Sequence, residues 1–292
     1  MDLKSYLREQ RELVEKYLEE YLPAEDTRPE VIHRSMRYSV FAGGKRLRPI
    51  LVLAACEAVG GNKMQAMPAA CALEMIHTYS LIHDDLPAMD NDDYRRGKLT
   101  NHKVFGDGIA VLAGCGLLTY AFQLMVQKMQ QVKPETVLRV IEEISLAAGF
   151  AGMIAGQVAD LEAEGKEISF ADLKYIHAHK TGALLRASLR AGAIIGGADD
   201  EVLNQITSYA EKIGLAFQIM DDILDLIGDE KKIGKKTGSD LTNNKATYPA
   251  FFGLPKSQEM AADLIEKAKN AVRDLDSEVL PAIADYIIKR DC

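Results

Sequence analysis

The sequence predicts an all-α protein built as a single large helical bundle, and three observations support this fold class. Apolar residues recur at helical spacing, as in the first stripe of Leu3, Leu7, Leu13, Val14, Tyr17 and Leu18. Alternating strand patterns are nearly absent, and the Asn-Gly dipeptide typical of tight hairpins does not occur. Hydrophobic residues make up 48% of the 292 residues, which is enough for a large core. No stretch resembles an interdomain linker, so we expect one domain over residues 1–292.

Signals for helix starts follow one another along the chain. The N-terminal segment mixes charges of both signs with apolar residues, which indicates an amphipathic helix rather than a signal peptide. Pro49, Pro68 and Pro134 each predict the start of a helix, because proline is tolerated in the first turn. The pattern Ser169–Asp172 resembles a capping box and predicts the start of the helix that contains Lys180.

Two uncharged segments, residues 108–127 and 144–159, need a separate interpretation. The first is 20 residues long, which is nominally enough to cross a bilayer. Glycine, alanine and glutamine make both segments only mildly apolar. We therefore expect two helices packed on all sides by other helices, and no membrane insertion.

Charge and cysteine content exclude some classes of protein. The chain has 35 Lys and Arg against 43 Asp and Glu, a net charge of −8, which disfavours a nucleic-acid-binding surface. Its four cysteines, Cys56, Cys71, Cys115 and Cys292, are scattered without a CxxC pair. Free thiols of this kind indicate a reducing compartment.

Two separate clusters of aspartates are the strongest indication of chemistry. The first holds Asp84, Asp85 and Asp90, and the second holds Asp221, Asp222 and Asp225. On a helix, side chains four positions apart share a face, so the carboxylates in the second cluster repel one another. Apolar flanks add a desolvation cost, and a divalent cation would remove both problems. Oxygen ligands without His or Cys favour magnesium, which also binds substrate phosphates.

The aspartate clusters also allow other interpretations. A single acidic pair is most often a solvated helix face, although two similar clusters favour a shared metal site. His83 next to Asp84 also raises a metal-dependent phosphohydrolase, in which such a dyad helps to hold the metal. That reading leaves the second cluster without a role.

Basic residues occur where a diphosphate would need them. The run Gly43–Pro49 places Lys45 and Arg48 at the start of a helix, whose N-terminus adds backbone donors. Arg95 and Arg96 follow the first acidic cluster, and guanidinium groups suit phosphate oxygens. Each could be an ordinary surface residue, but together they suggest a polyphosphate held between metal and cations.

These motifs resemble those of the trans-isoprenyl diphosphate synthases, more narrowly the bacterial farnesyl and related geranylgeranyl enzymes. The similar strings, in order, are GGKRLRP, SLIHDDLPAMDNDDYRRG, GQVADL, HKTGALL, FQIMDDILDLIGD and GKKTGSDLTNNKATYP. They extend from about residue 43 to residue 249, which is most of the chain. The resemblance implies the isoprenoid synthase fold, with helices around a central active-site cavity.

The resemblance also implies a role for individual residues. Both aspartate clusters would bind Mg²⁺, with three ions per active site, and they would act in catalysis together with Lys180. The positions that match those binding isopentenyl diphosphate are Lys45, Arg48, His77 and Arg96. The positions that match those binding the allylic diphosphate are Arg95, Lys180, Thr181, Gln218 and Lys235. The family further implies a cytoplasmic homodimer.

The function implied is condensation of isopentenyl diphosphate with dimethylallyl or geranyl diphosphate to farnesyl diphosphate. Magnesium-assisted ionisation would leave an allylic carbocation, which the isopentenyl double bond attacks before a proton is lost. Two alternatives remain: a geranylgeranyl diphosphate synthase, or a non-catalytic regulatory subunit of a prenyl synthase. Such a subunit would be expected to lose aspartates, and both clusters are complete here.

The most detailed expectation from the sequence concerns the length of the product. Tyr79 lies five residues before Asp84, and Ser80 four before it. In the resembling family, an aromatic residue at the fifth position goes with a fifteen-carbon product. Helical geometry places Ser80 about 40° from Asp84 but Tyr79 about 140° away. The role of Tyr79 as the floor of the pocket therefore rests on the resemblance.

Overall fold

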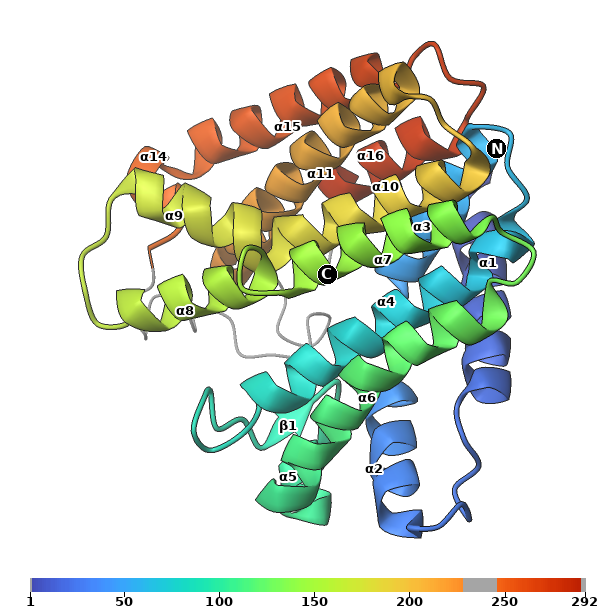
Figure 1. The fold of residues 1–292 in the computed structure, drawn as a ribbon. Coiled ribbons are helices and arrows are strands. Elements are labelled where there is room, and N and C mark those ends of the chain that lie inside the picture. The colour runs from blue at the N-terminus through green and yellow to red at the C-terminus, as the bar shows by residue number, and fades with distance from the viewer. Residues whose placement is uncertain (1, 228–245, 290–292) are drawn as a thin grey trace.

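A computed structural model describes residues 2–227 and 246–289, and its helices confirm the predicted all-α class (Figure 1). The longer helices are α1 (Leu3–Tyr21), α2 (Glu30–Val40), α3 (Leu47–Ala58), α4 (Lys63–Asp84), α6 (Asp107–Lys128), α7 (Pro134–Ala148), α8 (Met153–Ala163), α10 (Ala183–Gly196), α11 (Asp200–Ile227), α15 (Leu254–Ala271) and α16 (Val279–Lys289). The shorter elements are α5 (Asn101–Phe105), α9 (Phe170–Ile176), the π-helix η1 (His177–Gly182), α14 (Tyr248–Phe252) and the strands β1 (Tyr94–Arg95) and β2 (Lys98–Leu99).

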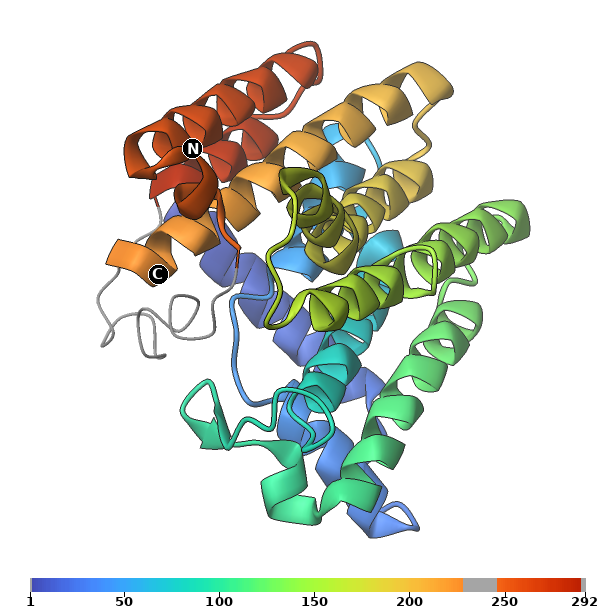
Figure 2. The same ribbon diagram turned by 90° about the vertical axis from the view of Figure 1, so that its left-hand side faces the viewer.

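Three helices, α3, α4 and α10, form the centre of the bundle. Most of their residues are buried, which is expected of helices that are hydrophobic on all sides. Helices α11, α15 and α16 lie together beyond α10, whereas α2, α5 and α6 lie near α4 on the opposite side (Figures 1 and 2). The C-terminal end of α4 and the C-terminal half of α11 carry the two predicted aspartate clusters.

Of the four predicted helix starts, two are confirmed, one is two residues late and one is wrong. Helix α3 begins at Leu47, so Pro49 lies in its first turn. Pro134 is the first residue of α7, and Ser169 caps α9 through a reciprocal capping box with Asp172. Helix α4 begins at Lys63, five residues before Pro68, because the side chain of Asn62 accepts a hydrogen bond from the Met64 amide and caps the helix there.

The uncharged segments are not packed on all sides, which corrects the expectation from the sequence. In α6, one face is buried, but Val111, Leu112 and Val126 are 41% to 63% exposed. The second segment is divided between α7 and α8, and Phe150 at the break is 87% exposed. Helix α6 is long and apolar enough to span a membrane, with a mean hydropathy of 1.9, but length and composition alone are weak grounds.

The two short strands form a hairpin that the sequence did not predict. They pair antiparallel, with Tyr94 opposite Leu99 and Arg95 opposite Lys98. Both turn residues have positive φ, 54° at Arg96 and 75° at Gly97, as in the tight turns that favour hairpins. Arginine rarely adopts this conformation, which is why the dipeptide gave no signal.

Candidate active site

The first aspartate cluster is formed by the end of α4 and the loop that follows. Asp84 is the last residue of the helix and Asp85 is its C-cap. The amide of Asp90 donates to the carbonyl of Asp84 at 2.9 Å, so the loop turns back on the helix end. This backbone closure gathers the three predicted carboxylates around one helix terminus.

Asp85 is buried and is paired with Arg95. Its Oδ1 accepts from Arg95 Nε at 2.7 Å and lies 2.6 Å from a terminal guanidinium nitrogen. Burial raises the pKa of Asp85, and the hydrogen bond from Arg95 opposes that rise. Arg95 therefore both neutralises Asp85 and fixes the hairpin against α4.

Asp84 has a pKa well above the ordinary value of an aspartate. Burial raises its pKa to about 6, and the nearby charge of Asp90 adds to the rise while Lys180 opposes it. The charge of Lys180, on η1, therefore acts on the carboxylate at the end of α4. The charged form of Asp84 is thus disfavoured unless further positive charge is supplied.

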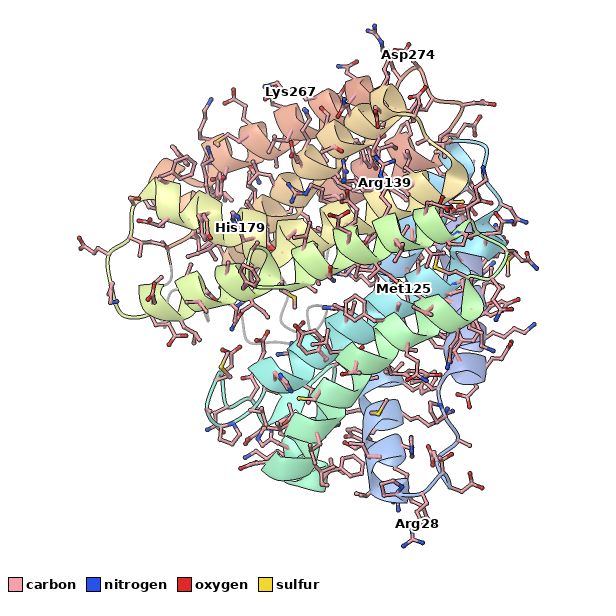
Figure 3. The ribbon with its side chains drawn as sticks, in the orientation of Figure 1. Arg28, Met125, Arg139, His179, Lys267 and Asp274 are labelled. Carbon is pink, nitrogen blue, oxygen red and sulfur yellow. The ribbon has the colours of Figure 1, made fainter. Side chains whose placement is uncertain are left out.

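Lys180 is held in place by α8. Its Nζ lies 2.5 Å from Asp160 Oδ2. Helix α8 approaches η1 closely because residue 156 is glycine, where a Cβ would lie 2.0 Å from the Lys180 amide nitrogen. Isolated π-helical turns of this kind are frequent at functional sites. His179 of the same segment is labelled in Figure 3. Its ring instead stacks on that of Tyr175, with centroids 3.9 Å apart.

The second cluster divides into two environments. Asp221 and Asp225 lie one turn apart and are partly exposed, whereas Asp222 is only 8% exposed. Asp222 Oδ2 accepts from the amide of Tyr248 at 2.8 Å, and its Oδ1 lies 3.9 Å from His177 Nε2. Asp222 therefore joins α11 to α14 and reaches η1.

One pocket brings several predicted residues together. It has a volume of about 180 Å³ and lies between α8, η1 and α11. We call it the η1 pocket, and its polar lining includes Asp160, His177, Lys180, Thr181, Gln218 and Asp222. Lys180, Thr181, Gln218 and Asp222 were predicted from the sequence, whereas Lys235 lies outside the described residues.

Predicted cations cluster on the neighbouring side of the site. Burial lowers the pKa of Arg48 to about 10, with Arg96 contributing while Glu74 and Asp221 oppose it. Burial and the charges of Arg48 and Arg96 hold the pKa of His77 well below its usual value. These mutually unfavourable positive charges form a site suited to an anion. Lys45, before this cluster in the chain, is exposed.

Arg96 joins the two basic motifs directly. One terminal nitrogen donates to the carbonyl of Gly43. At Gly44, φ is +129°, and a Cβ would lie 2.7 Å from Arg96 Cζ, so glycine is needed both for the turn and for the contact.

Tyr79 and Ser80, predicted to control product length, have different surroundings. The Ser80 hydroxyl donates to the carbonyl of His77 within its own helix at 2.9 Å. Tyr79 is 6% exposed, and burial raises its pKa to about 12, with the charges of Asp84 and Cys115 adding to the rise. The Tyr79 ring thus lies at the side of α4 that faces α6.

His83 does not support the phosphohydrolase interpretation. Its Nε2 lies 3.2 Å from the carbonyl of Val111 on α6 and donates to it, since a carbonyl can only accept. The ring is therefore engaged with a neighbouring helix, whereas a metal-binding dyad needs a ring nitrogen directed at the ion.

Sequence reasoning missed two residues of the η1 pocket, Asp160 and His177. Asp160 is the first charge after the uncharged segment 144–159, and this position was an available signal. His177 has no signal of its own, but its Nδ1 is buried without a partner in the described residues.

The six aspartates suit magnesium, since they supply only oxygen donors. Within residues 2–227 and 246–289, no three His, Cys, Asp or Glu side chains already converge on one point. The raised pKa of Asp84 nevertheless fits a cation-binding role, because a cation would stabilise its charged form.

Comparison with known proteins gives the family. The polyprenyl synthetase model matches residues 29–283, nearly the whole chain. The chain belongs to the polyprenyl synthetase family. It is therefore a short-chain prenyltransferase, as predicted.

The chain has relatives named farnesyl diphosphate synthase and relatives named geranylgeranyl diphosphate synthase. It is 50% identical to the farnesyl diphosphate synthase of Geobacillus stearothermophilus, covering 100% of this chain and 99% of that protein. It is 48% identical to the geranylgeranyl diphosphate synthase of Cyanophora paradoxa, covering 99% and 97%. The crystal structure of geranylgeranyl pyrophosphate synthetase from Pyrococcus horikoshii matches with a TM-score of 0.88 at 35% identity, covering 99% and 98%. The predicted isoprenoid synthase fold is confirmed.

The raised pKa of Asp84 predicts how stability depends on pH without metal. The folded carboxyl titrates near pH 6 and the unfolded one near its ordinary 3.8, so the folded state binds more protons between these values. The contribution of Asp84 to the free energy of unfolding therefore falls as pH rises from about 4 to 6. Asp84→Asn should lack this fall and be about 1–3 kcal/mol more stable than wild type at pH 7.

The measurement is urea unfolding from pH 4 to 7 with a chelator present. Asp26→Asn, at an exposed position, is the control and should keep the wild-type profile. An Asp84→Asn profile parallel to that of wild type would contradict the assigned pKa.

Proposed function

We propose that this enzyme condenses isopentenyl diphosphate with dimethylallyl and then geranyl diphosphate to give farnesyl diphosphate. The observation that supports this most is that Lys180 lies near both aspartate clusters, since it lines the η1 pocket with Asp222 and its charge acts on Asp84, while a second group of cations lies nearby. One group is Lys180 in the η1 pocket, and the other is Arg48 with Arg96 beside His77. Two cation groups suit two diphosphate substrates, whereas hydrolysis of one substrate would need only one.

Magnesium would be held by the two aspartate clusters, and we propose three ions per site. The ligands would be Asp84, Asp85, Asp90, Asp221, Asp222 and Asp225. When bound, magnesium would supply positive charge to the oxygens of the departing diphosphate. Asp160 keeps Lys180 charged and in position, because burial alone would lower the pKa of Lys180 while Asp160 raises it.

The remaining residues would bind and orient the two substrates. The allylic diphosphate would contact Arg95, Lys180, Thr181 and Gln218, together with Lys235. Isopentenyl diphosphate would contact Lys45, Arg48, His77 and Arg96. A neutral imidazole at His77, as its lowered pKa requires, can donate one hydrogen bond to a phosphate oxygen.

The reaction follows from this placement. The allylic carbon–oxygen bond breaks, and its electron pair leaves with the diphosphate, which Lys180 and Arg95 stabilise. The double bond of isopentenyl diphosphate then forms the new carbon–carbon bond, and loss of a proton to the released diphosphate restores a double bond. Water must be kept from the carbocation, which the surrounding helices can do.

A geranylgeranyl diphosphate synthase is the second candidate, and the 48% identity to such an enzyme favours it. The presence of an aromatic residue, Tyr79, before the first cluster favours the farnesyl product instead. A non-catalytic subunit is less well supported, since both aspartate clusters are complete.

We further propose that the chain is one catalytic domain over residues 1–292 and acts in the cytoplasm as a homodimer without membrane insertion. An apolar surface on α6, α7 and the break after α7 supports the dimer, and its residues are 41% to 87% exposed. They are Val111, Leu112, Val126, Leu138, Leu146 and Phe150. A patch of this kind is typical of an interface. A two-fold axis would place α6 against α6 of a second copy.

Leu112→Glu should prevent dimerisation. Leu112 is 57% exposed, and a two-fold axis would bring both introduced charges into the interface. We expect wild type to sediment as a dimer of the 32.1 kDa chain, and the variant to associate at least about 100-fold more weakly. Val31→Glu, on α2 and 42% exposed, is the matched control. A monomeric wild type at micromolar concentration would contradict the proposal.

Asp84→Ala and Asp225→Ala should each reduce turnover roughly 100-fold or more, because each loses a ligand of the metal-bound diphosphate. The assay combines labelled isopentenyl diphosphate, each allylic primer and saturating magnesium, with chromatography of dephosphorylated products. Asp93→Ala is the control, since Asp93 lies in the same acidic run but is paired with Lys103 at 2.7 Å. Wild-type turnover in either cluster variant would refute the two-cluster model.

Tyr79→Ala should lengthen the product from fifteen to twenty carbons or more, because the phenol ring no longer closes the pocket. Tyr79→Phe keeps the ring and should still give fifteen carbons. The distribution of product lengths is measured with excess isopentenyl diphosphate. A wild type that makes mainly twenty carbons, or an alanine variant that stops at fifteen, would show that Tyr79 is not the stop.

A further inference from the structure

The ring of His83 is fixed between two helices. It extends from the last turn of α4 to α6, where its Nε2 donates to the Val111 carbonyl at 3.2 Å. This contact uses a backbone group, so it does not depend on the identity of the side chain at Val111.

Gly114 makes this contact possible. A Cβ built at Gly114 would lie 2.2 Å from His83 Nε2 and 2.5 Å from Cδ2, so the ring occupies the space of the missing side chain. Other glycines of α6 lack such a constraint. A Cβ at Gly116 would meet only the flexible end of Met36 at 3.2 Å, and one at Gly108 would meet nothing.

The same ring supports Tyr79. Tyr79 lies one turn before His83 on α4, and the two rings meet edge to face with centroids 5.6 Å apart and planes at 82°. Because Tyr79 is 6% exposed, its ring has neighbours on nearly every side. Displacement of His83 toward Tyr79 would force the Tyr79 ring to move, and displacement away from it would remove the edge contact.

We propose that Gly114 is a specificity-determining position, which seats His83 and through it positions Tyr79 to limit product length. The inference rests on the proposed function, in which Tyr79 closes the pocket. Gly114 and His83 are positioning residues here, and neither touches substrate. In the alternative explanation, His83 supports the neighbouring Asp84 instead of Tyr79. A change at His83 would then alter turnover without altering product length.

The test measures the ratio of twenty-carbon to fifteen-carbon products for Gly114→Ala, His83→Ala and Gly116→Ala, each first checked for folding by thermal unfolding. Gly114→Ala and His83→Ala should raise the ratio about twofold to tenfold, the range expected for loss of one edge-to-face contact. Gly116→Ala should keep the wild-type ratio. If Gly114→Ala does not fold, His83→Ala tests the proposal, because it removes the ring without adding a Cβ.

A double variant with Tyr79→Ala tests whether Gly114 acts on product length through Tyr79. Gly114→Ala should add nothing to the product lengths of Tyr79→Ala, whereas an added shift of equal size would show that Gly114 acts independently and would overturn the proposal. A wild-type ratio in both single variants, with or without lost turnover, would also overturn it. A wild type that makes no prenyl diphosphate would instead refute the proposed function itself, and this inference with it.

Discussion

Burial of charged groups within the helical bundle is the constraint on which the rest of the structure depends. A buried charge without a partner costs several kcal/mol, whereas an exposed ion pair contributes about 1 kcal/mol or less. Two pairs of buried charges are accordingly held at short range. Arg46 and Glu74 lie 2.6 Å apart with almost no exposure, and Asp85 is equally close to Arg95. These pairs decide which segments can lie side by side.

Each pair at the site joins segments that the chain alone would leave independent. Arg95 fixes the hairpin to the end of α4, Asp160 fixes η1 to α8, and Asp222 fixes α11 to α14 through the Tyr248 amide. Asp84 differs from its neighbours, because burial raises its pKa to about 6 despite the opposing charge of Lys180. These charges are therefore neutralised within the protein, whereas the ionised form of Asp84 would be stabilised by additional positive charge. This is the electrostatic condition under which a divalent cation binds most favourably.

The sequence predicted those parts of the protein that local spacing determines. Helical periodicity predicted the fold class, and the motifs predicted both aspartate clusters and the basic residues near them. It did not predict the pairing of Asp160 with Lys180, because nothing local relates residues 20 positions apart on different helices. The start of α4 was misplaced because a side-chain cap at Asn62 outweighed the signal from Pro68. The exposed face of α6 was missed because composition gives the apolar content of a helix but not which of its faces has a neighbour.

Helix α6 links the support of Tyr79 to the exposed apolar surface, because its two faces have different neighbours. The buried face carries Gly114 and holds His83, which in turn supports Tyr79. The opposite face carries Leu112 and Val126, part of the apolar surface that a second copy would cover. Both faces belong to one backbone, so a rotation of α6 about its axis moves both faces together. Packing of a partner on the outer face would therefore also fix the Val111 carbonyl that holds His83, so dimerisation and control of product length would depend on the same helix.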